Sequence, residues 1–170
     1  MTRPPRRKPE PVQQVKMRRD RALARLVSSV PYIGFLGITF DRRGDELTAV
    51  LPWRDGLIGN PVLPALHGGV TAGFMEAAAI VELTWMLHWQ AMEAAADAGR
   101  PVPEDLPPLP RTIDFSVDFL RIGLPRDAYA RARIARSGRR YASVHVEAWQ
   151  DNRARLFAQA SGHFLMPGRV

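Results

Sequence analysis

Residues 59–81, which read GNPVLPALHGGVTAGFMEAAAIV, decide the fold of this chain. A loop rich in Pro and Gly leads into His67, Gly68 and Gly69. From there to about Ala96 the chain has no proline and is rich in Ala, Leu, Met and Glu, which predicts one long helix. The first half of this helix is apolar nearly all round, so we expect it to be buried.

Glu76 is the only charged residue between Asp55 and Glu82. A carboxylate among Val, Ala, Phe and Met side chains is costly to bury, and helix packing alone would favour Ala or Leu. A carboxylate kept in such surroundings suits a general base. Periodicity alone leaves a second interpretation open, in which Glu76 points into solvent or pairs with an arginine.

Gly68 and Gly69 stand at the predicted start of the helix. Two glycines let a ligand approach the backbone closely. The unpaired N–H groups and the positive end of the helix dipole suit a developing oxyanion. Glu76 lies two turns further along, so in a dimer a facing helix would supply the acid opposite the oxyanion donors.

Alternating apolar and polar residues on both sides of the helix predict strands. The predicted strands are 37–40, 46–51, 112–122, 128–134, 141–148 and 156–164. Residues 12–29 have the composition of a further helix, which Pro31 ends. The chain is therefore predicted to be an α+β protein, in which a curved antiparallel sheet wraps one long central helix.

The net charge of +7 comes from the N-terminus. Residues 1–25 hold nine basic and two acidic side chains, whereas residues 26–170 hold 15 of each and are neutral. We therefore expect one domain over 26–170, after a basic and partly disordered segment over 1–25, and no nucleic-acid-binding body. The chain has no cysteine, which excludes disulfides and thiolate zinc sites. Without an apolar secretory region near the N-terminus, a cytoplasmic location is expected.

The stretch NPVLPALHGGVTAGFMEAAA resembles the signature of the PaaI-like hotdog acyl-CoA thioesterases, in the 4-hydroxybenzoyl-CoA thioesterase superfamily. The pattern of that family is His-Gly-Gly, six residues, then Asp or Glu. Four other stretches resemble strands or segments of the family in the same order: VPYIGFLGI, TIDFSVDFLRIG, RSGRRYASVHVEAW and LFAQASGHFLM. The resemblance runs from about Val30 to Met166.

The resemblance implies a hotdog fold that forms a homodimer or homotetramer, with active sites across the interface. It implies hydrolysis of an acyl-CoA thioester to a free acid and CoA, with Glu76 as general base or as nucleophile. The backbone N–H of Gly69, with that of Val70, would polarise the carbonyl group. His67 would shape the loop, Asn60 would orient water or the leaving group, and Thr112 would hold the attacking water.

For the CoA part of the substrate, the resemblance points to Gly68 and Val70 at the helix start, to Arg121 and to the turn Gly138–Arg140. Arg139 and Arg140 suit phosphate groups because the guanidinium is a planar donor fork. We expect no cofactor beyond the CoA of the substrate.

Two other functions are weighed. One is a non-catalytic hotdog protein that binds or senses acyl-CoA, although an acid at position 76 argues against pure binding. The other is a hotdog dehydratase, but the His paired with an acid that this chemistry uses is not evident. His88, His145 and His163 form no ligand cluster in the sequence, so no metal site and no membrane insertion are expected.

Overall fold

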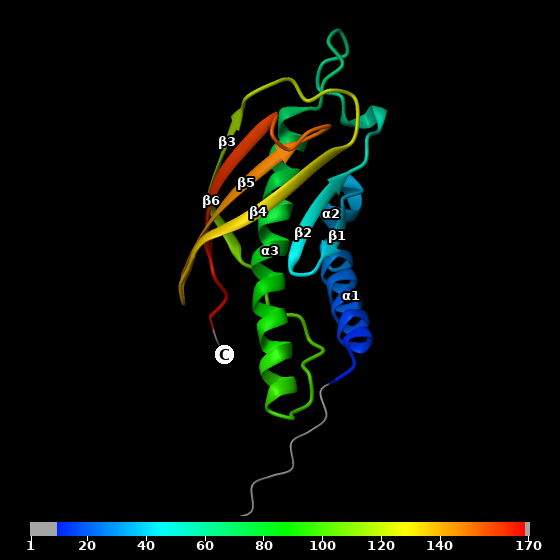
Figure 1. Ribbon diagram of the computed structural model, residues 1–170. Coiled ribbons are helices and arrows are strands. Elements are labelled where there is room, and N and C mark those ends of the chain that lie inside the picture. Colours follow the sequence, from blue (N-terminus) through cyan, green and yellow to red (C-terminus); the bar gives the residue numbers. More distant parts are fainter. Residues whose placement is uncertain (1–9, 169–170) are drawn as a thin grey trace, which may run out of the picture.

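A computed structural model describes residues 10–168 of the chain (Figure 1). Three α-helices, one short 3-10 helix and six strands follow one another in these residues. The helices are α1 (Val12–Ser28), α2 (Pro31–Leu36) and α3 (Gly68–Asp97), with the 3-10 helix at Asp55–Leu57. The strands are β1 (Thr39–Arg43), β2 (Glu46–Leu51), β3 (Arg111–Phe119), β4 (Ala128–Ser137), β5 (Tyr141–Trp149) and β6 (Ala158–Leu165).

The six strands form one antiparallel sheet in the order β1-β2-β4-β5-β6-β3. The sheet curves around α3, which runs along its concave face (Figure 1). This arrangement confirms the predicted α+β plan. Strand β3, which follows the helix, crosses to the far edge of the sheet and pairs only with β6 among the described residues.

The core lies between α3 and the inner face of the sheet. Small side chains such as Ala130, Ala148 and Ala158 face inward from the middle strands, so the helix packs close to the backbone. Larger side chains fill the layer from the helix side, with Phe74 and Met75 fully buried. Helix α3 is long and apolar enough to cross a membrane, but its apolar side chains are used in this core.

Helix α2 is absent from the sequence-based expectation. The prediction ended the first helix at Pro31, whereas a second short helix begins there, with proline at a first-turn position where no N–H is needed. Gly37 ends it with a φ of 72°, a left-handed conformation that favours glycine. The predicted strand over 37–40 is therefore shifted to Thr39–Arg43.

Helix α1 packs against α3 through Ala22, Leu23 and Leu26, which belong to the main core. The predicted domain boundary at residue 25 therefore falls inside a packed helix. The part of the predicted disordered segment before residue 10 lies outside the described residues.

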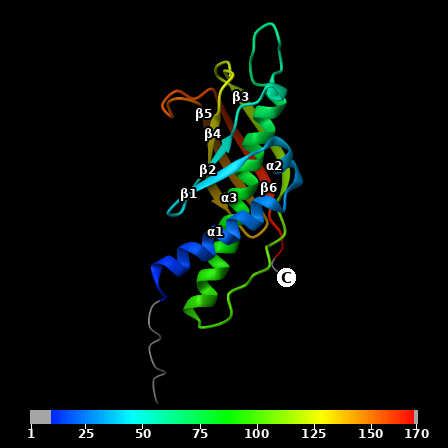
Figure 2. The same ribbon diagram turned by 90° about the vertical axis from the view of Figure 1, so that its right-hand side faces the viewer.

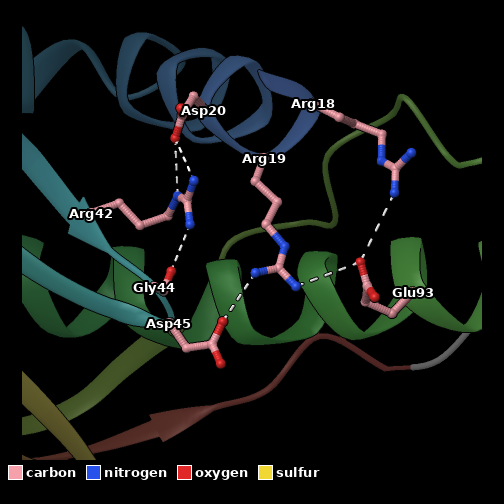
Figure 3. Close-up of polar contacts among 7 residues, drawn as sticks. All are labelled: Arg18, Arg19, Asp20, Arg42, Gly44, Asp45 and Glu93. Carbon is pink, nitrogen blue, oxygen red and sulfur yellow. Dashed lines mark hydrogen bonds and ion pairs between the residues drawn. The ribbon is translucent and has the colours of Figure 1, made fainter. Parts of the chain in front are cut away.

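Figure 3 shows Arg18 and Arg19 of α1 both reaching Glu93 on α3, at 3.9 and 3.6 Å. The guanidinium of Arg19 also lies 3.3 Å from the ring centre of Trp89.

Candidate functional site

His67 caps the N-terminus of α3. Its Nδ1 accepts a hydrogen bond from the N–H of Gly69 at 2.9 Å, and its carbonyl accepts one from Thr71. The N–H of Gly69 is therefore engaged within the chain. The N–H groups of Gly68 and Val70 have no acceptor among the described residues, so they are the donors that face outward at this helix end.

Glu76 is half-buried and accepts a hydrogen bond of 2.6 Å at Oε1 from the hydroxyl of Thr112. The two residues are 36 positions apart and come from the central helix and the edge strand. No arginine pairs with Glu76 in the part of the chain that the structure describes. Its second oxygen, Oε2, makes no hydrogen bond there. The interpretation in which Glu76 pairs with an arginine thus finds no support.

Strand β3 runs antiparallel to the first two turns of α3. Thr112 lies beside Glu76 at one end, and Phe119 lies against Gly68 at the other, about van der Waals distance from where a Cβ of Gly68 would stand. Gly69 and Glu76 are seven residues apart on this helix, or about 10 Å along its axis. One small carbonyl group therefore cannot contact both the amide donors and the carboxylate of the same chain.

Tyr32 of α2 is a site neighbour that the sequence reasoning missed. A Cβ at Gly73 would stand 2.8 Å from its hydroxyl, so the phenol lies directly over the helix, one turn before Glu76. Tyr32 stacks on Phe35, and both rings are exposed. The two residues were overlooked because α2 itself was not predicted, and the sequence VPYIGFLGI does not show that Tyr32 reaches the distant helix.

Asn60 lies in the loop before His67, and its Oδ1 accepts hydrogen bonds from the N–H groups of Val62 and Leu63 at 3.0 and 3.3 Å. This is an Asx turn that shapes the loop. The backbone of this loop comes very close to His67, since a Cβ on Gly59 would stand 2.7 Å from the His67 Cα. Among the described residues Asn60 forms no hydrogen bond with Glu76 or Thr112, and its predicted role with water stays a prediction.

The predicted CoA-binding arginines fall into two places. Arg139 and Arg140 are exposed in the β4–β5 turn, beside a cavity of about 500 Å³ that His163 and Gly138 also line. The strand register aligns Thr112 with Phe164 and Phe164 with Ala142, so this turn lies two strands from Thr112 at the same end of the sheet. Arg121 lies beyond the other end of β3 and donates to the carbonyl of Leu156 at 2.5 Å.

Glu82 is the acid on α3 whose ionisation the fold perturbs most clearly. Burial raises the pKa of Glu82 from 4.5 to about 7. The residue lies under the gap where β2 diverges from β4, since the pairing of these strands stops at Ala49 and Ala130. Sequence reasoning singled out Glu76 because of its apolar neighbours, but the tertiary packing desolvates Glu82.

We expect Glu82→Gln to flatten the pH dependence of stability. The pKa is higher in the folded than in the unfolded chain, so the contribution of Glu82 to stability is fully present below about pH 4.5 and is lost as the pH rises through 7. Between pH 5 and pH 8 the wild type should therefore lose on the order of 2 kcal/mol relative to Glu82→Gln. Urea unfolding at both pH values measures this difference, and parallel pH profiles of the two proteins would contradict it.

Comparisons with known proteins identify the family and the fold. Residues 60–165 match the family described as acyl-CoA thioesterase N-terminal domain. A solved protein from Chromobacterium violaceum is 35% identical, with 92% of this chain and 98% of that chain covered and a TM-score of 0.60. The E. coli PaaI protein from the phenylacetic acid degradation operon is 14% identical, with coverage of 88% and 94% and a TM-score of 0.66. A phenylacetic acid degradation-related protein from Ralstonia eutropha is 21% identical, with coverage of 85% and 99% and a TM-score of 0.64. No curated protein matches the chain.

Proposed function

Because the chain belongs to the acyl-CoA thioesterase domain family that its residues 60–165 match, we propose that it hydrolyses acyl-CoA thioesters with Glu76 as the catalytic carboxylate. The hotdog fold and the PaaI-like relationship follow from the same comparisons. The observation that carries the catalytic assignment is the hydrogen bond from Thr112 to Glu76, which holds a half-buried carboxylate at the edge of the sheet.

As a general base, Glu76 takes a proton from water through Oε2, the oxygen that has no partner among residues 10–168. The water oxygen bonds to the thioester carbonyl carbon, the C–S bond breaks, and the CoA sulfur leaves with a proton. As a nucleophile, the carboxylate would instead attack the same carbon and form an anhydride, which water then opens. The geometry is compatible with both routes, since the Thr112 hydroxyl occupies only Oε1.

The carbonyl oxygen needs N–H donors while charge develops on it. Of the two donors inferred from the family, Val70 is the better suited, because its N–H has no acceptor among the described residues. Gly69, the donor inferred from the family, would become free only if the His67 ring turned away from its N–H. The proposal therefore has Val70 as the first donor and Gly69 as the second, with His67 controlling access to the second.

A second copy of the chain completes the site in this proposal. The separation of about 10 Å between Gly69 and Glu76 requires the acid and the donors to come from different copies. The outer edge of β3 carries exposed Ile113 and Phe119 and has no strand partner in the described chain. A long apolar edge of this kind favours pairing with another strand, so we place the dimer interface at β3.

The CoA phosphates are assigned to Arg139 and Arg140. Both side chains are exposed, and neither forms an ion pair within residues 10–168, so their guanidiniums are available to phosphate. The assignment of Arg121 is weaker because its guanidinium is already used by the Leu156 carbonyl. Gly138 contributes the tight turn, since its N–H donates to the carbonyl of Tyr141 at 2.8 Å.

The test is release of free thiol from a panel of aromatic, branched and medium-chain acyl-CoA substrates by the full chain. Turnover of at least one substrate supports the proposal and begins to identify the acyl group. If acyl-CoA binds but no substrate is turned over, the chain is an acyl-CoA sensor and the proposal is wrong. A chain lacking residues 1–9 serves as the matched control, because a thioesterase should keep its activity without this basic segment. A deletion of residues 1–25 is not suitable, because it would remove core residues of α1.

A further inference from the structure

A groove lies at the end of α3 that is remote from the helix start. Its walls are α1, the C-terminal half of α3 and the Pro-rich return over residues 98–110, which run side by side in Figures 1 and 2. The groove has a volume of about 450 Å³, within the range of small-molecule sites, roughly 300–1,000 Å³. His88 in its wall is twelve residues from Glu76, or about 18 Å along the helix. The thioesterase mechanism therefore makes no use of this place.

His88 is a buried polar group without a partner. The residue is only 3% exposed, and its side chain makes no hydrogen bond to any of the residues 10–168. Burial and the positive charge of Arg25 lower the pKa of His88, so the ring is neutral at pH 7 and keeps one N–H donor. The ring nitrogens of His88 are not among the fully enclosed atoms without a partner in the described residues, so they open onto the groove and are available to a ligand there.

Three arginines of α1 line the same groove at helical spacing: Arg18, Arg21 and Arg25. Arg18 is paired with Glu10 at 2.6 Å. Arg21 and Arg25 have no ion pair in the described part of the chain, and the only other charged side chain in the lining is the exposed Glu104 of the return. The groove thus has two uncompensated guanidiniums against one carboxylate, an excess of one positive charge.

The remaining wall is apolar. Met17 and Ala22 line it from α1, Met92 from α3, and Val102 and Pro103 from the return. Methionine side chains adapt to differently shaped apolar ligands. An excess single positive charge beside an apolar wall matches a molecule with one negative charge and an apolar body.

We propose that this groove is a second binding site, which takes a free monocarboxylic acid with a short aliphatic chain. The carboxylate lies between Arg21 and Arg25, whose donor forks match its two oxygens, and the His88 N–H donates to the same head group. The chain packs on Met17, Met92 and Val102. A monoanion neutralises the excess charge of one, whereas a phosphate dianion would reverse it.

Calorimetric titration of the full chain with octanoate, without any thioester present, tests the proposal. Octanoate should bind, and Arg25→Gln or Arg21→Gln should each weaken binding about 10-fold or more, since a hydrogen bond to a charged group is lost. Arg43→Gln is the matched control, because Arg43 is an exposed arginine remote from the groove with 82% of its side chain accessible. Glu76→Gln should leave octanoate binding unchanged, which distinguishes the groove from a product site at the carboxylate.

Octanamide provides a measurement that does not depend on the folding of a variant. It has the same chain without the charge, so it should bind the wild type at least about 10-fold more weakly than octanoate does. The proposal is overturned if octanoate does not bind, if both arginine variants bind it as tightly as the wild type, or if octanamide binds equally well. Because no turnover is measured, none of these outcomes depends on the thioesterase assignment.

Discussion

Glu76→Gln is expected to lower the rate of acyl-CoA hydrolysis at least 100-fold. The amide keeps the size of the side chain and can still accept a hydrogen bond from Thr112, but it can neither take a proton from water nor attack a carbonyl carbon. Loss of a positioned acid or base typically costs roughly 10²–10⁴ in rate. Steady-state kinetics on the best substrate of the panel measure the effect, which should appear in kcat because binding of the CoA part does not involve Glu76.

Glu82→Gln is the matched control for this experiment. It is the same substitution on the same helix, at an acid that the proposed mechanism does not use, so the hydrolysis rate should stay within about threefold of the wild type. Thr112→Val should fall between the two variants, because it leaves the carboxylate in place but removes the hydroxyl that holds it. If Glu76→Gln retained wild-type kcat, the assignment of the catalytic carboxylate would be wrong whatever the other variants did.

Gly162→Val is expected to destabilise the fold by about 3 kcal/mol, the upper part of the range for overpacked cores. Gly162 lies on β6 directly opposite Phe115 of β3, and an added Cβ would stand 2.5 Å from the Phe115 ring and 2.9 Å from that of Phe164. The two rings pack edge to face with centres 6.3 Å apart, and Phe164 is fully buried. Phe164 is enclosed, so the added side chain should push Phe115, and strand β3 with it, away from β6.

Thermal unfolding measures this prediction, with an expected decrease of Tm of about 6 °C or more. Gly34→Ala is the control: Gly34 lies inside α2 with no atom within 4 Å of an added Cβ, so alanine should leave Tm unchanged or raise it slightly. An unchanged Tm for Gly162→Val would mean that β3 is not held against Gly162 as the structure shows. Because β3 also carries Thr112, a shifted strand should lower the hydrolysis rate as well.

Helix α3 is the part of the fold that the sequence predicted best. The helix is observed at Gly68–Asp97 where residues 68–96 were expected, because an unbroken apolar run between a glycine pair and a proline-rich return leaves the chain few other choices. The strand pairs β1–β2 and β4–β5 could be predicted equally well from the sequence, since a short turn joins the two strands of each pair. Helix α2 was missed because six residues after a proline have too little periodicity to predict a helix.

Local sequence by itself therefore determined the α+β class, the long helix and the two elements of the candidate site that lie on it, the glycine pair and Glu76. Only the tertiary structure decided which groups meet them. The crossing of β3 to the sheet edge brings Thr112 to Glu76, and the cap by His67 engages Gly69 and leaves Val70 open. The packing of α3 against the sheet desolvates Glu82. Periodicity describes what one segment presents to its surroundings, whereas hydrogen bonds and desolvation depend on segments that are distant in the chain and become neighbours only after folding.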